Sequence, residues 1–471
     1  MPSIRSLTTP RRRRWTIAAR FALASTGLTA GALALASMAP SPSSPGALRP
    51  LPDGPLTPRT VPLILGVGVH FGIGGEYNYD PKLTAQAIDT IGASSFRDDL
   101  TWSGFKAAGM TAPGSMRPRQ AAFLAATTAR PLFILDHPNP AIGGDGVPVT
   151  DAGRAAFASF AGDAARQTAA RRPIYEIWNE WNLNAAPAMG KLIGPAAPGD
   201  PRGGAAYAQL AAKAAASIRA AQPGATILAG AAGTDEGWHW VRAVAGGGGL
   251  RGADGLSVHY YNHCARPEDR TAGEAIGKIQ ALHDAMPGRG GRATPIYVTE
   301  IGWPTTRGGS CDIARNDSGD NIAQFLLWSA ATPWVRGVWI YQLKDQGQRP
   351  TDIEDNFGLF TYDYKPKPGA CMVRDVSRLI ASAKSWRVDR PQPGLTVVRM
   401  DDGKSRKLIA WTDRATQTAQ LVLGGTPMAY RTVCAPDGPR DTTIPIGSRP
   451  VVVSLAGSAA GIRYRMMLRR E

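Results

Sequence analysis

Two glutamates in this 471-residue chain each follow an apolar stretch and lie next to tryptophan. Glu180 follows the run PIYEIW and one asparagine, between Trp178 and Trp181, and Glu300 follows PIYVT and precedes Trp303. Two carboxyl groups about 5–5.5 Å apart can hydrolyse a glycosidic bond with retention, because one protonates the leaving oxygen while the other attacks the anomeric carbon. A single such glutamate more often pairs with a loop cation. Two of them beside tryptophans that can stack on sugar faces favour a catalytic pair.

The elements that must position these glutamates alternate regularly from about residue 61. Short apolar or β-branched runs, typical of strands, are followed by alanine-rich segments of helical period. The predicted strands are 63–70, 94–99, 131–136, 173–178, 226–231, 254–259, 295–300 and 337–342. Helices are predicted near 82–92, 117–129, 151–171, 204–222, 234–245, 272–286, 318–331 and 370–384. Eight such units favour a (β/α)8 TIM barrel over a doubly wound open sheet, since Gly66, Gly68 and Gly72 lack the GxGxxG spacing.

The C-terminal ends of the barrel strands are where polar and aromatic residues gather. In TIM barrels these ends form the active site. The strands that carry Glu180 and Glu300 are three βα units apart, so the two side chains are predicted to face each other across the mouth of the barrel. Candidate substrate-binding residues at the same ends are Arg97, His137, Asn179, His259, Tyr261, Trp303, Trp339 and Tyr341.

The motifs Trp-Asn-Glu and Thr-Glu-Ile-Gly-Trp resemble the two signatures of the clan A glycoside hydrolases, and among them families 5 and 39. The resemblance covers residues 61 to about 384 and implies a (β/α)8 barrel with a retaining mechanism. It implies that Glu180 is the acid/base and Glu300 the nucleophile. It also implies that Asn179 hydrogen-bonds the 2-hydroxyl of the sugar under attack.

Other positions of the family 5 pattern also find counterparts in this sequence. The resemblance implies that Arg97 keeps Glu300 ionised, that His137 and the His259–Tyr261 pair contact substrate, and that Trp339 forms a stacking platform. Tyr341 lies on the same face of the last strand, and only one of these two aromatics need be the platform. The sequence departs from the pattern at Trp181, where much of the clan has proline. The family mechanism needs no cofactor or metal, and we expect none.

Composition excludes several other classes of protein. Hydrophobic residues make up 43% of the chain and charged residues 19%, which is typical of a globular protein and not of a disordered one. The four cysteines show no CxxC spacing, so zinc-finger and thioredoxin-like motifs are absent. The rest of the chain shows no dense Lys/Arg run interleaved with aromatics, so we expect no nucleic-acid partner.

The first 36 residues are typical of an export signal. They carry six arginines and no acidic residue, then an apolar stretch that ends in Ala34-Leu35-Ala36. We therefore expect export to the periplasm or the extracellular space; an uncleaved membrane anchor is the alternative. Loss of the six arginines lowers the net charge from +16 to +10. That charge fits a solvated basic face, an anionic polysaccharide or a membrane surface.

The two ends of the chain differ in character from the barrel. Residues 37–60 are rich in proline and serine and are predicted to be a linker, followed by a barrel over 61–384. Strand-like segments at 395–400, 407–412, 418–423 and 450–455 predict a small antiparallel, β-sandwich-like domain over 385–460. Residues 461–471 are predicted to be a basic tail.

Export makes disulfide bonds the favoured state of the four cysteines. The pairing Cys264–Cys311 would join the loops after the sixth and seventh barrel strands, and Cys371–Cys434 would tie the barrel to the β domain. This is one of three connectivities that four cysteines allow.

Together these features predict an exported, retaining β-glycosidase that acts on a polysaccharide or oligosaccharide, and the tryptophan-lined mouth favours endo action. Two alternatives share the same residues: a carbohydrate-binding protein without turnover, and a transglycosylase that remodels an exopolysaccharide. The sequence leaves the sugar, the linkage and the oligomeric state open.

Overall fold

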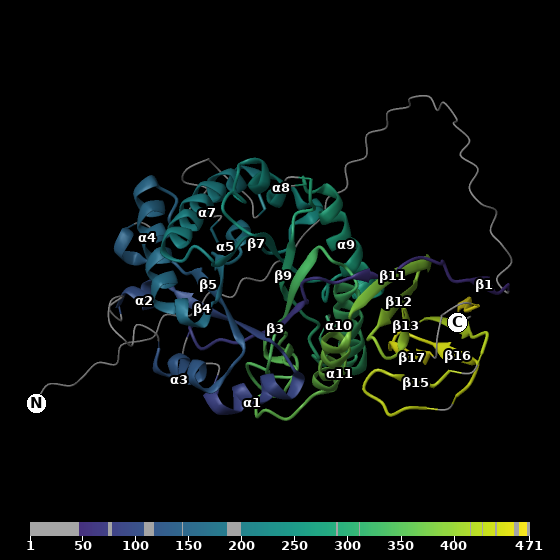
Figure 1. Ribbon diagram of the computed structural model, residues 1–471. Helices are drawn as coiled ribbons and strands as arrows, with labels where there is room; N and C mark the ends of the chain where they lie inside the picture. The colour runs from purple at the N-terminus through teal and green to yellow at the C-terminus, as the bar shows by residue number, and fades with distance from the viewer. Residues whose placement is uncertain are drawn as a thin grey trace, which may run out of the picture. The chain divides into compact units, whose positions relative to one another are not determined.

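A closed barrel of eight parallel strands is the central feature of the computed structural model (Figure 1). The structure describes residues 47–73, 78–107, 117–143, 145–185, 199–288, 291–309, 311–414, 416–425, 427–438, 440–455 and 461–468. The barrel closes in the order β10-β3-β4-β5-β6-β7-β8-β9. Its strands are β3 Ile64–Gly68, β4 Ser95–Thr101, β5 Arg130–Asp136, β6 Ile174–Ile177, β7 Thr226–Ala232, β8 Gly255–Tyr260, β9 Ile296–Ile301 and β10 Val335–Ile340. The predicted TIM barrel is confirmed.

Helices alternate with these strands and cover the outside of the barrel (Figure 1). Their bounds are α1 Pro81–Ile91, α2 Trp102–Ala107, α3 Pro118–Ala126, α4 Asp151–Thr168, α5 Trp181–Asn184, α7 Pro201–Ala221, α8 His239–Gly246, α9 Ala272–Ala285, α10 Arg315–Ala330 and α11 Pro368–Ser382. The side chains of Asp80, Thr150 and Thr271 cap α1, α4 and α9 by accepting hydrogen bonds from first-turn N–H groups. The helix predicted at 234–245 begins only at His239, because Gly237 takes a left-handed conformation at φ 72°.

Side chains fill the interior of the barrel below its mouth. Leu132, Ile134, Ile174, Leu228, Tyr297 and Trp339 pack together there, and all are at least 92% buried. A packed interior of this kind is the rule in TIM barrels, so substrate can reach only the loops and strand ends above it.

Two antiparallel sheets follow the barrel, as the sequence predicts. One sheet has the order β15-β17-β13-β12-β11-β2 and the other β1-β18-β14-β16. The C-terminal strands are β11 Ser385–Gln392, β12 Leu395–Asp401, β13 Arg406–Thr412, β14 Gln417–Val422, β15 Ala429–Thr432, β16 Thr443–Ile446, β17 Val451–Leu455 and β18 Arg463–Leu468. A single apolar cluster draws residues from both sheets, including Val397, Leu421, Ile444 and Val453. The two sheets therefore form a sandwich around one core.

The predicted linker and tail both contribute strands to this sandwich. β1 (Arg49–Pro50) pairs with β18, and β2 (Thr57–Pro58) pairs with β11. The predicted basic tail thus contains β18, whose residues 463–468 pair with β14 along its whole length. Two-residue strands that contain proline carry no alternation pattern, and proline is tolerated at sheet edges, so the sequence gives no strand signal there.

Two disulfides and several polar contacts join the barrel helices and loops to one another and to the sandwich. Cys264 is bonded to Cys311 and Cys371 to Cys434, which confirms the preferred connectivity. Arg449 Nε donates to Asp320 on α10 at 2.9 Å, and the Gln324 side chain on α10 donates to the Ser448 carbonyl at 2.6 Å.

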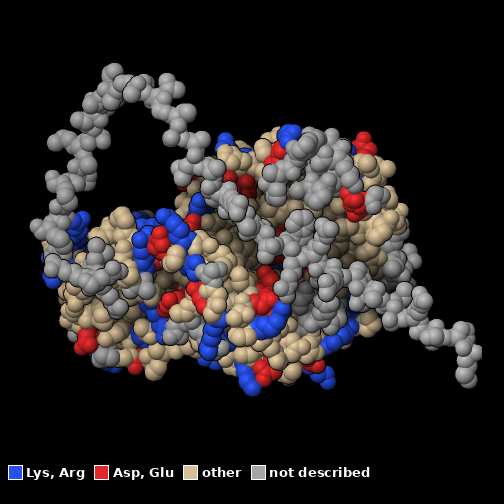
Figure 2. Space-filling model, turned by 180° about the vertical axis from the view of Figure 1, so that it is seen from behind, with Lys and Arg blue, Asp and Glu red and all other residues tan. Residues whose placement is uncertain are grey.

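The predicted export signal and the first part of the predicted linker, up to residue 46, lie outside the described residues. Within the described ranges, no helix combines the length and the apolar character needed to cross a bilayer. On the face shown in Figure 2, basic and acidic side chains are interspersed.

Candidate active site

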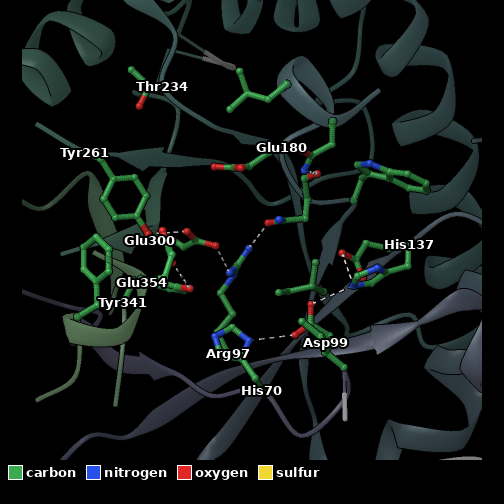
Figure 3. A pocket seen from close by; sticks show the side chains of 18 of the residues that line it. His70, Arg97, Asp99, His137, Glu180, Thr234, Tyr261, Glu300, Tyr341 and Glu354 are labelled. Carbon is green, nitrogen blue, oxygen red and sulfur yellow. Dashed lines mark hydrogen bonds and ion pairs between the residues drawn. The ribbon is translucent and has the colours of Figure 1, made fainter. Parts of the chain in front are cut away.

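A cavity of about 610 Å³ opens at the C-terminal ends of the barrel strands (Figure 3). Five carboxylates line it, against a single residue of the Lys/Arg type among the described lining residues. The lining includes Asp99, Asp136, Glu180, Glu300 and Glu354, with Arg97, Asn179, His70, His137, Tyr261, His263, Tyr341, Trp178, Thr234 and Phe357.

Glu180 and Glu300 face the same cavity, as the sequence predicts. Glu300 belongs to β9, while Glu180 follows β6 and immediately precedes α5. One carboxylate oxygen of each lies within 4.8 Å of the other, and within 4.8 Å of a ring nitrogen of His259. The side chain of Glu180 is 23% exposed and that of Glu300 is 12% exposed. Both carboxyl groups can thus reach one bound molecule.

Arg97 on β4 connects Glu300 to the floor of the site. Its Nη1 donates to Glu300 Oε1 at 2.5 Å, its Nε donates to Glu176 Oε2 at 2.7 Å, and its Nη2 donates to Asn179 Oδ1 at 2.8 Å. Burial opposes the charge of Arg97, but the negative charges of Glu176 and Glu300 outweigh burial and raise the pKa of Arg97. Arg97 is therefore a fixed cation beside Glu300.

Tyr261 and His259 complete the surroundings of Glu300. The Tyr261 hydroxyl donates to Glu300 Oε2 at 2.6 Å, and His259 Nδ1 lies 3.6 Å from the same oxygen. Burial alone would raise the pKa of Glu300. The charges of His259 and Arg97, with the hydrogen bonds from Tyr261 and Arg97, outweigh it and lower the pKa of this carboxyl. Glu300 is thus held as a carboxylate, the form that a nucleophile requires.

The buried imidazole of His259 links the two glutamates. Its Nδ1 lies 3.0 Å from Glu180 Oε1, and its Nε2 lies 3.2 Å from Arg97 Nη2. Burial opposes protonation of this ring, but the charge of Glu300 and the hydrogen bond to Glu180 raise its pKa. His259 therefore fixes the position of Glu180 relative to Glu300.

The backbone around Glu180 is unusual. Trp178 and Glu180 both have positive φ values, 66° and 47°, and the Glu180 N–H donates to the Ala231 carbonyl at 2.8 Å. Non-glycine residues in this conformation are uncommon and gather at functional sites. Gly233 lies against the carboxyl group, since a Cβ there would stand 2.8 Å from Glu180 Oε1. The turn after β6 thus aims Glu180 into the cavity.

A second charged cluster lines the cavity on the other side of Arg97 (Figure 3). His137 Nε2 lies 3.6 Å from Asp99 Oδ1 and 3.5 Å from Asp136 Oδ2, and His70 Nδ1 lies 3.5 Å from Asp99 Oδ2. Burial opposes protonation of His137, but Asp99 and Asp136 raise its pKa to about 9. One atom each from Asp99, Asp136 and His137 lie within 4.8 Å of one another, as do those of Glu180, His259 and Glu300. These two triads are the described groups whose geometry could hold a metal ion.

Two tryptophans that were predicted to contact substrate, Trp303 and Trp339, do not line the cavity. Trp339 has no exposed surface; it packs in the barrel interior and its Nε1 donates to Ser95 Oγ at 3.0 Å. Tyr341, two residues later, lines the cavity, because a strand rises about 3.3 Å per residue and Trp339 stands one layer deeper. Trp303 is 2% exposed and its Nε1 donates to Asn262 Oδ1 at 2.8 Å, so it braces the loops after β8 and β9.

The other predicted residues meet at the site: Arg97, His137, Asn179, Glu180, Tyr261, Glu300 and Tyr341 line the cavity, and His259 lies behind the glutamates. Three further residues of the site, Glu176, Glu354 and Thr234, were not predicted from the sequence. Glu176 could have been found, because it is the one charged residue in the apolar run 173–178. Glu354 and Thr234 lie in loops without a pattern, and no local signal marks them.

Comparison with known proteins identifies the fold. No family model matches the sequence. A curated protein described as a probable glucan endo-1,3-beta-glucosidase of Arabidopsis thaliana is 34% identical over 95 residues. That match spans 19% of this chain and 27% of the plant protein, so it reaches about a quarter of that relative's length.

Solved structures of glycoside hydrolases match over most of the chain. A family 39 glycoside hydrolase from Bacteroides cellulosilyticus WH2 aligns with a TM-score of 0.67 at 20% identity, covering 85% of this chain and 82% of that one. A monomeric beta-xylosidase from Caulobacter crescentus CB15 aligns with a TM-score of 0.52 at 14% identity, and the alignment covers 85% of this chain and 97% of that one. A family 30 endoxylanase from Clostridium papyrosolvens C71 aligns with a TM-score of 0.51 at 10% identity, and the alignment covers 85% of this chain and 98% of that one. At these identities the likeness shows that this chain shares the fold of clan A glycoside hydrolases.

Proposed function

We propose that this protein is a retaining glycoside hydrolase that cleaves β-glycosidic bonds of a polysaccharide, with Glu300 as nucleophile and Glu180 as acid/base. One observation carries the proposal: oxygens of the two carboxyl groups lie within 4.8 Å of each other in a cavity large enough for sugar residues. The shared fold with glycoside hydrolases of families 39 and 30 supports it.

In the first step, a Glu300 oxygen attacks the anomeric carbon and forms a glycosyl ester as the bond to the leaving oxygen breaks. Glu180 donates its proton to that oxygen, so the leaving sugar departs as an alcohol. Arg97 and Tyr261 hold Glu300 ionised and oriented before the attack. Asn179, fixed by Arg97, is the donor for the 2-hydroxyl of the sugar under attack.

In the second step, a water molecule replaces the sugar that has left. The ionised Glu180 takes a proton from this water, whose oxygen attacks the anomeric carbon and releases Glu300 as a carboxylate. Two displacements restore the original anomeric configuration. An acceptor sugar in place of water would give transglycosylation by the same residues.

The charge of the cavity bears on the class of glycan. Its described lining holds five acidic side chains but only two basic groups that are charged near neutral pH, Arg97 and His137, whose pKa is raised to about 9, so a uronic-acid or sulfated sugar would find few cations to pair with. We therefore propose a neutral β-glycan, with endo action on the polymer. The names of the similar proteins, a glucan endo-1,3-beta-glucosidase, a beta-xylosidase and an endoxylanase, support glucans and xylans as the first substrates to test.

We also propose that the protein is exported. The basic and apolar pattern of residues 1–36 supports this, and so do two disulfides that use all four cysteines, since such bonds persist outside the reducing cytoplasm. The test is to determine the N-terminal residue of protein recovered from the producing cells and their medium.

The test of the activity is release of reducing ends from β-1,3-glucan, xylan and mannan by the full chain and by Glu180→Gln and Glu300→Gln. We expect each variant to lose about 10²–10⁴-fold in rate. Glu180→Gln alone should retain activity on an aryl glycoside whose leaving group needs no proton, and azide should rescue its second step. Wild-type rates in both variants would refute the assignment. Binding without release would identify a carbohydrate-binding protein, and products longer than the substrate would identify a transglycosylase.

A further inference from the structure

The part of the cavity beside Glu180 carries three side chains to which the two-step mechanism gives no role. Leu183 and Asn184 belong to α5, which begins immediately after Glu180, and Thr234 follows β7. All three line the cavity. Leu183 is partly buried, and Asn184 and Thr234 are exposed. We call these three side chains the Leu183 surface.

The cavity has two ends, and the catalytic glutamates lie between them. Figure 3 shows Thr234 beyond Glu180 at one end, and the cluster of Asp99 and His137 at the other. The oxygen that receives the proton of Glu180 carries the leaving sugar, so that sugar lies on the Glu180 side of the bond that breaks. The sugar under attack lies over Glu300 and extends the other way. The leaving sugar therefore reaches the end at which Thr234 stands.

Close contact with Gly233 places Leu183 beside the proton donor. A Cβ on Gly233 would stand 2.8 Å from Glu180 Oε1 and 2.5 Å from Leu183 Cδ1. Both side chains therefore lie against the same glycine, one on its way to the reacting bond and the other at the wall. A sugar bonded to the oxygen that Glu180 protonates comes within reach of Leu183.

Hydrogen bonds fix the Leu183 surface before any sugar arrives. The side chain of Asn182, which is 4% exposed, accepts from the Gly233 N–H at 3.0 Å and donates to the Gly233 carbonyl at 3.2 Å. These two bonds join α5 to the loop after β7. The Glu180 N–H donates to the Ala231 carbonyl at 2.8 Å and joins the same two segments again. A surface held in this way loses little conformational freedom when it binds a ligand.

The chemistry of the Leu183 surface suits an uncharged sugar. Leu183 offers an apolar contact for the C–H groups of a sugar ring. Asn184 Nδ2 donates to the Asn179 carbonyl at 3.3 Å, and its side-chain oxygen accepts no hydrogen bond from the described residues. The Thr234 hydroxyl likewise has no partner among the described residues. An amide oxygen and a hydroxyl can pair with sugar hydroxyl groups, and neither carries a charge that an ionised sugar would need.

We infer that Leu183, Asn184 and Thr234 bind the leaving sugar. This sugar is an uncharged ring whose apolar face packs on Leu183 and whose hydroxyl groups pair with Asn184 and Thr234. The role rests on the proposed function and adds to it the residues that select the group on the leaving side of the bond. An acceptor sugar in transglycosylation would occupy the same surface, because it enters where the leaving sugar departs.

The test compares substrates that differ only in the leaving group. Laminaritriose and xylotriose release a sugar, whereas β-laminaribiosyl fluoride and β-xylobiosyl fluoride release a fluoride ion, which makes no contact with a sugar-binding surface. The quantity measured is kcat/KM for the trisaccharide divided by kcat/KM for the matching fluoride. In Leu183→Ala and in Thr234→Val we expect this ratio to fall about two- to tenfold, the effect of lost apolar contact or of one neutral hydrogen bond. Damage to the fold or to Glu300 would lower both rates and leave the ratio unchanged.

Val147→Ala is the matched control. Val147 is another partly buried aliphatic residue of the same cavity, in the loop that follows His137. Its ratio should stay at the wild-type value, because it stands on the side of the sugar under attack. Wild-type ratios in both Leu183→Ala and Thr234→Val would overturn the inference. A ratio that falls only in Val147→Ala would place the leaving sugar at the other end of the cavity and overturn it as well.

Binding measurements separate failure of this inference from failure of the proposed function. If the wild type cleaves none of these substrates, the hydrolase proposal fails, and the calorimetric affinity for laminaritriose and xylotriose then decides on the Leu183 surface. Weaker binding in Leu183→Ala and Thr234→Val, with wild-type unfolding temperatures, would support the surface as a sugar site. Equal affinities, or no binding by the wild type, would overturn it.

Discussion

Replacing Tyr261 by phenylalanine removes one of the two short hydrogen bonds that Glu300, the proposed nucleophile, accepts; Arg97 donates the other. The hydroxyl donates to Glu300 Oε2 at 2.6 Å. The ring packs edge-on against Phe357 and Tyr341, with centroids 5.8 and 6.1 Å away, so the phenylalanine ring keeps its place. The change therefore tests the electrostatics of Glu300 with little change in packing.

The direction in which the pH profile should shift follows from the lowered pKa of Glu300. Activity is lost as the pH falls through that pKa, because the nucleophile becomes protonated. Without the Tyr261 donor the ionised form is less stable, the pKa rises, and activity is lost at a higher pH. A hydrogen bond to a charged group contributes about 1.5–3 kcal/mol, and about 1.4 kcal/mol corresponds to one pH unit, so the acid limb should move up by about one to two pH units.

The assay is the pH profile of kcat/KM, which reports ionisations of the free enzyme. Tyr260→Phe is the matched control: it is the same change one residue earlier, and its hydroxyl donates to Glu274 on α9 at 2.8 Å, away from the cavity. The control should leave the acid limb in place. An unshifted or downshifted acid limb in Tyr261→Phe would show that another group sets it, and would refute the assignment of Glu300 as the ionised nucleophile.

Three further predictions concern the supports of the site. Gly233→Ala should lower kcat with little change in unfolding temperature, since its Cβ would stand 2.8 Å from Glu180 Oε1; unchanged kcat would show that the carboxyl has room to move. Trp339→Ala should lower stability in urea by about 3–5 kcal/mol, because it empties a packed layer of the barrel, and a loss confined to KM would contradict its interior position. Cys371→Ser should lower stability by about 4 kcal/mol, from release of the loop of 63 residues closed by Cys434; calorimetry under oxidising conditions measures this, and equal unfolding temperatures would contradict it.

The barrel could be predicted from the sequence because parallel strands buried on both faces are continuous apolar runs with abrupt polar ends. The run PIYVTE contributes all but its proline to β9, a strand that is buried except at Glu300. Glu180 and Glu300 could be found for the same reason, since a carboxylate at the end of such a run has no role in packing. The regular order of strands then places them across the mouth from each other.

The depth of a side chain along a strand could not be predicted in the same way. Trp339 and Tyr341 share a face, and only the closed barrel shows that the first lies in the packed interior and the second at the mouth. Glu354 enters the cavity from a short 3-10 turn after β10, where local sequence carries no periodicity. Its position depends on the path of the loop, which distant packing decides.

The pairing of β1 with β18 and of β2 with β11 makes the barrel an insertion within the sandwich. The strands β1 and β2, one in each sheet, precede the barrel in the sequence, and the remaining strands of both sheets, β11 to β18, follow it. During synthesis β2 can pair only after β11 (Ser385–Gln392) has been made, and β1 only after β18 (Arg463–Leu468) has been made, so both early strands wait until the barrel strands are complete. A chain shortened after α11 would therefore lose more than an appended domain, because residues 49–58 would keep unpaired strand edges beside a finished barrel.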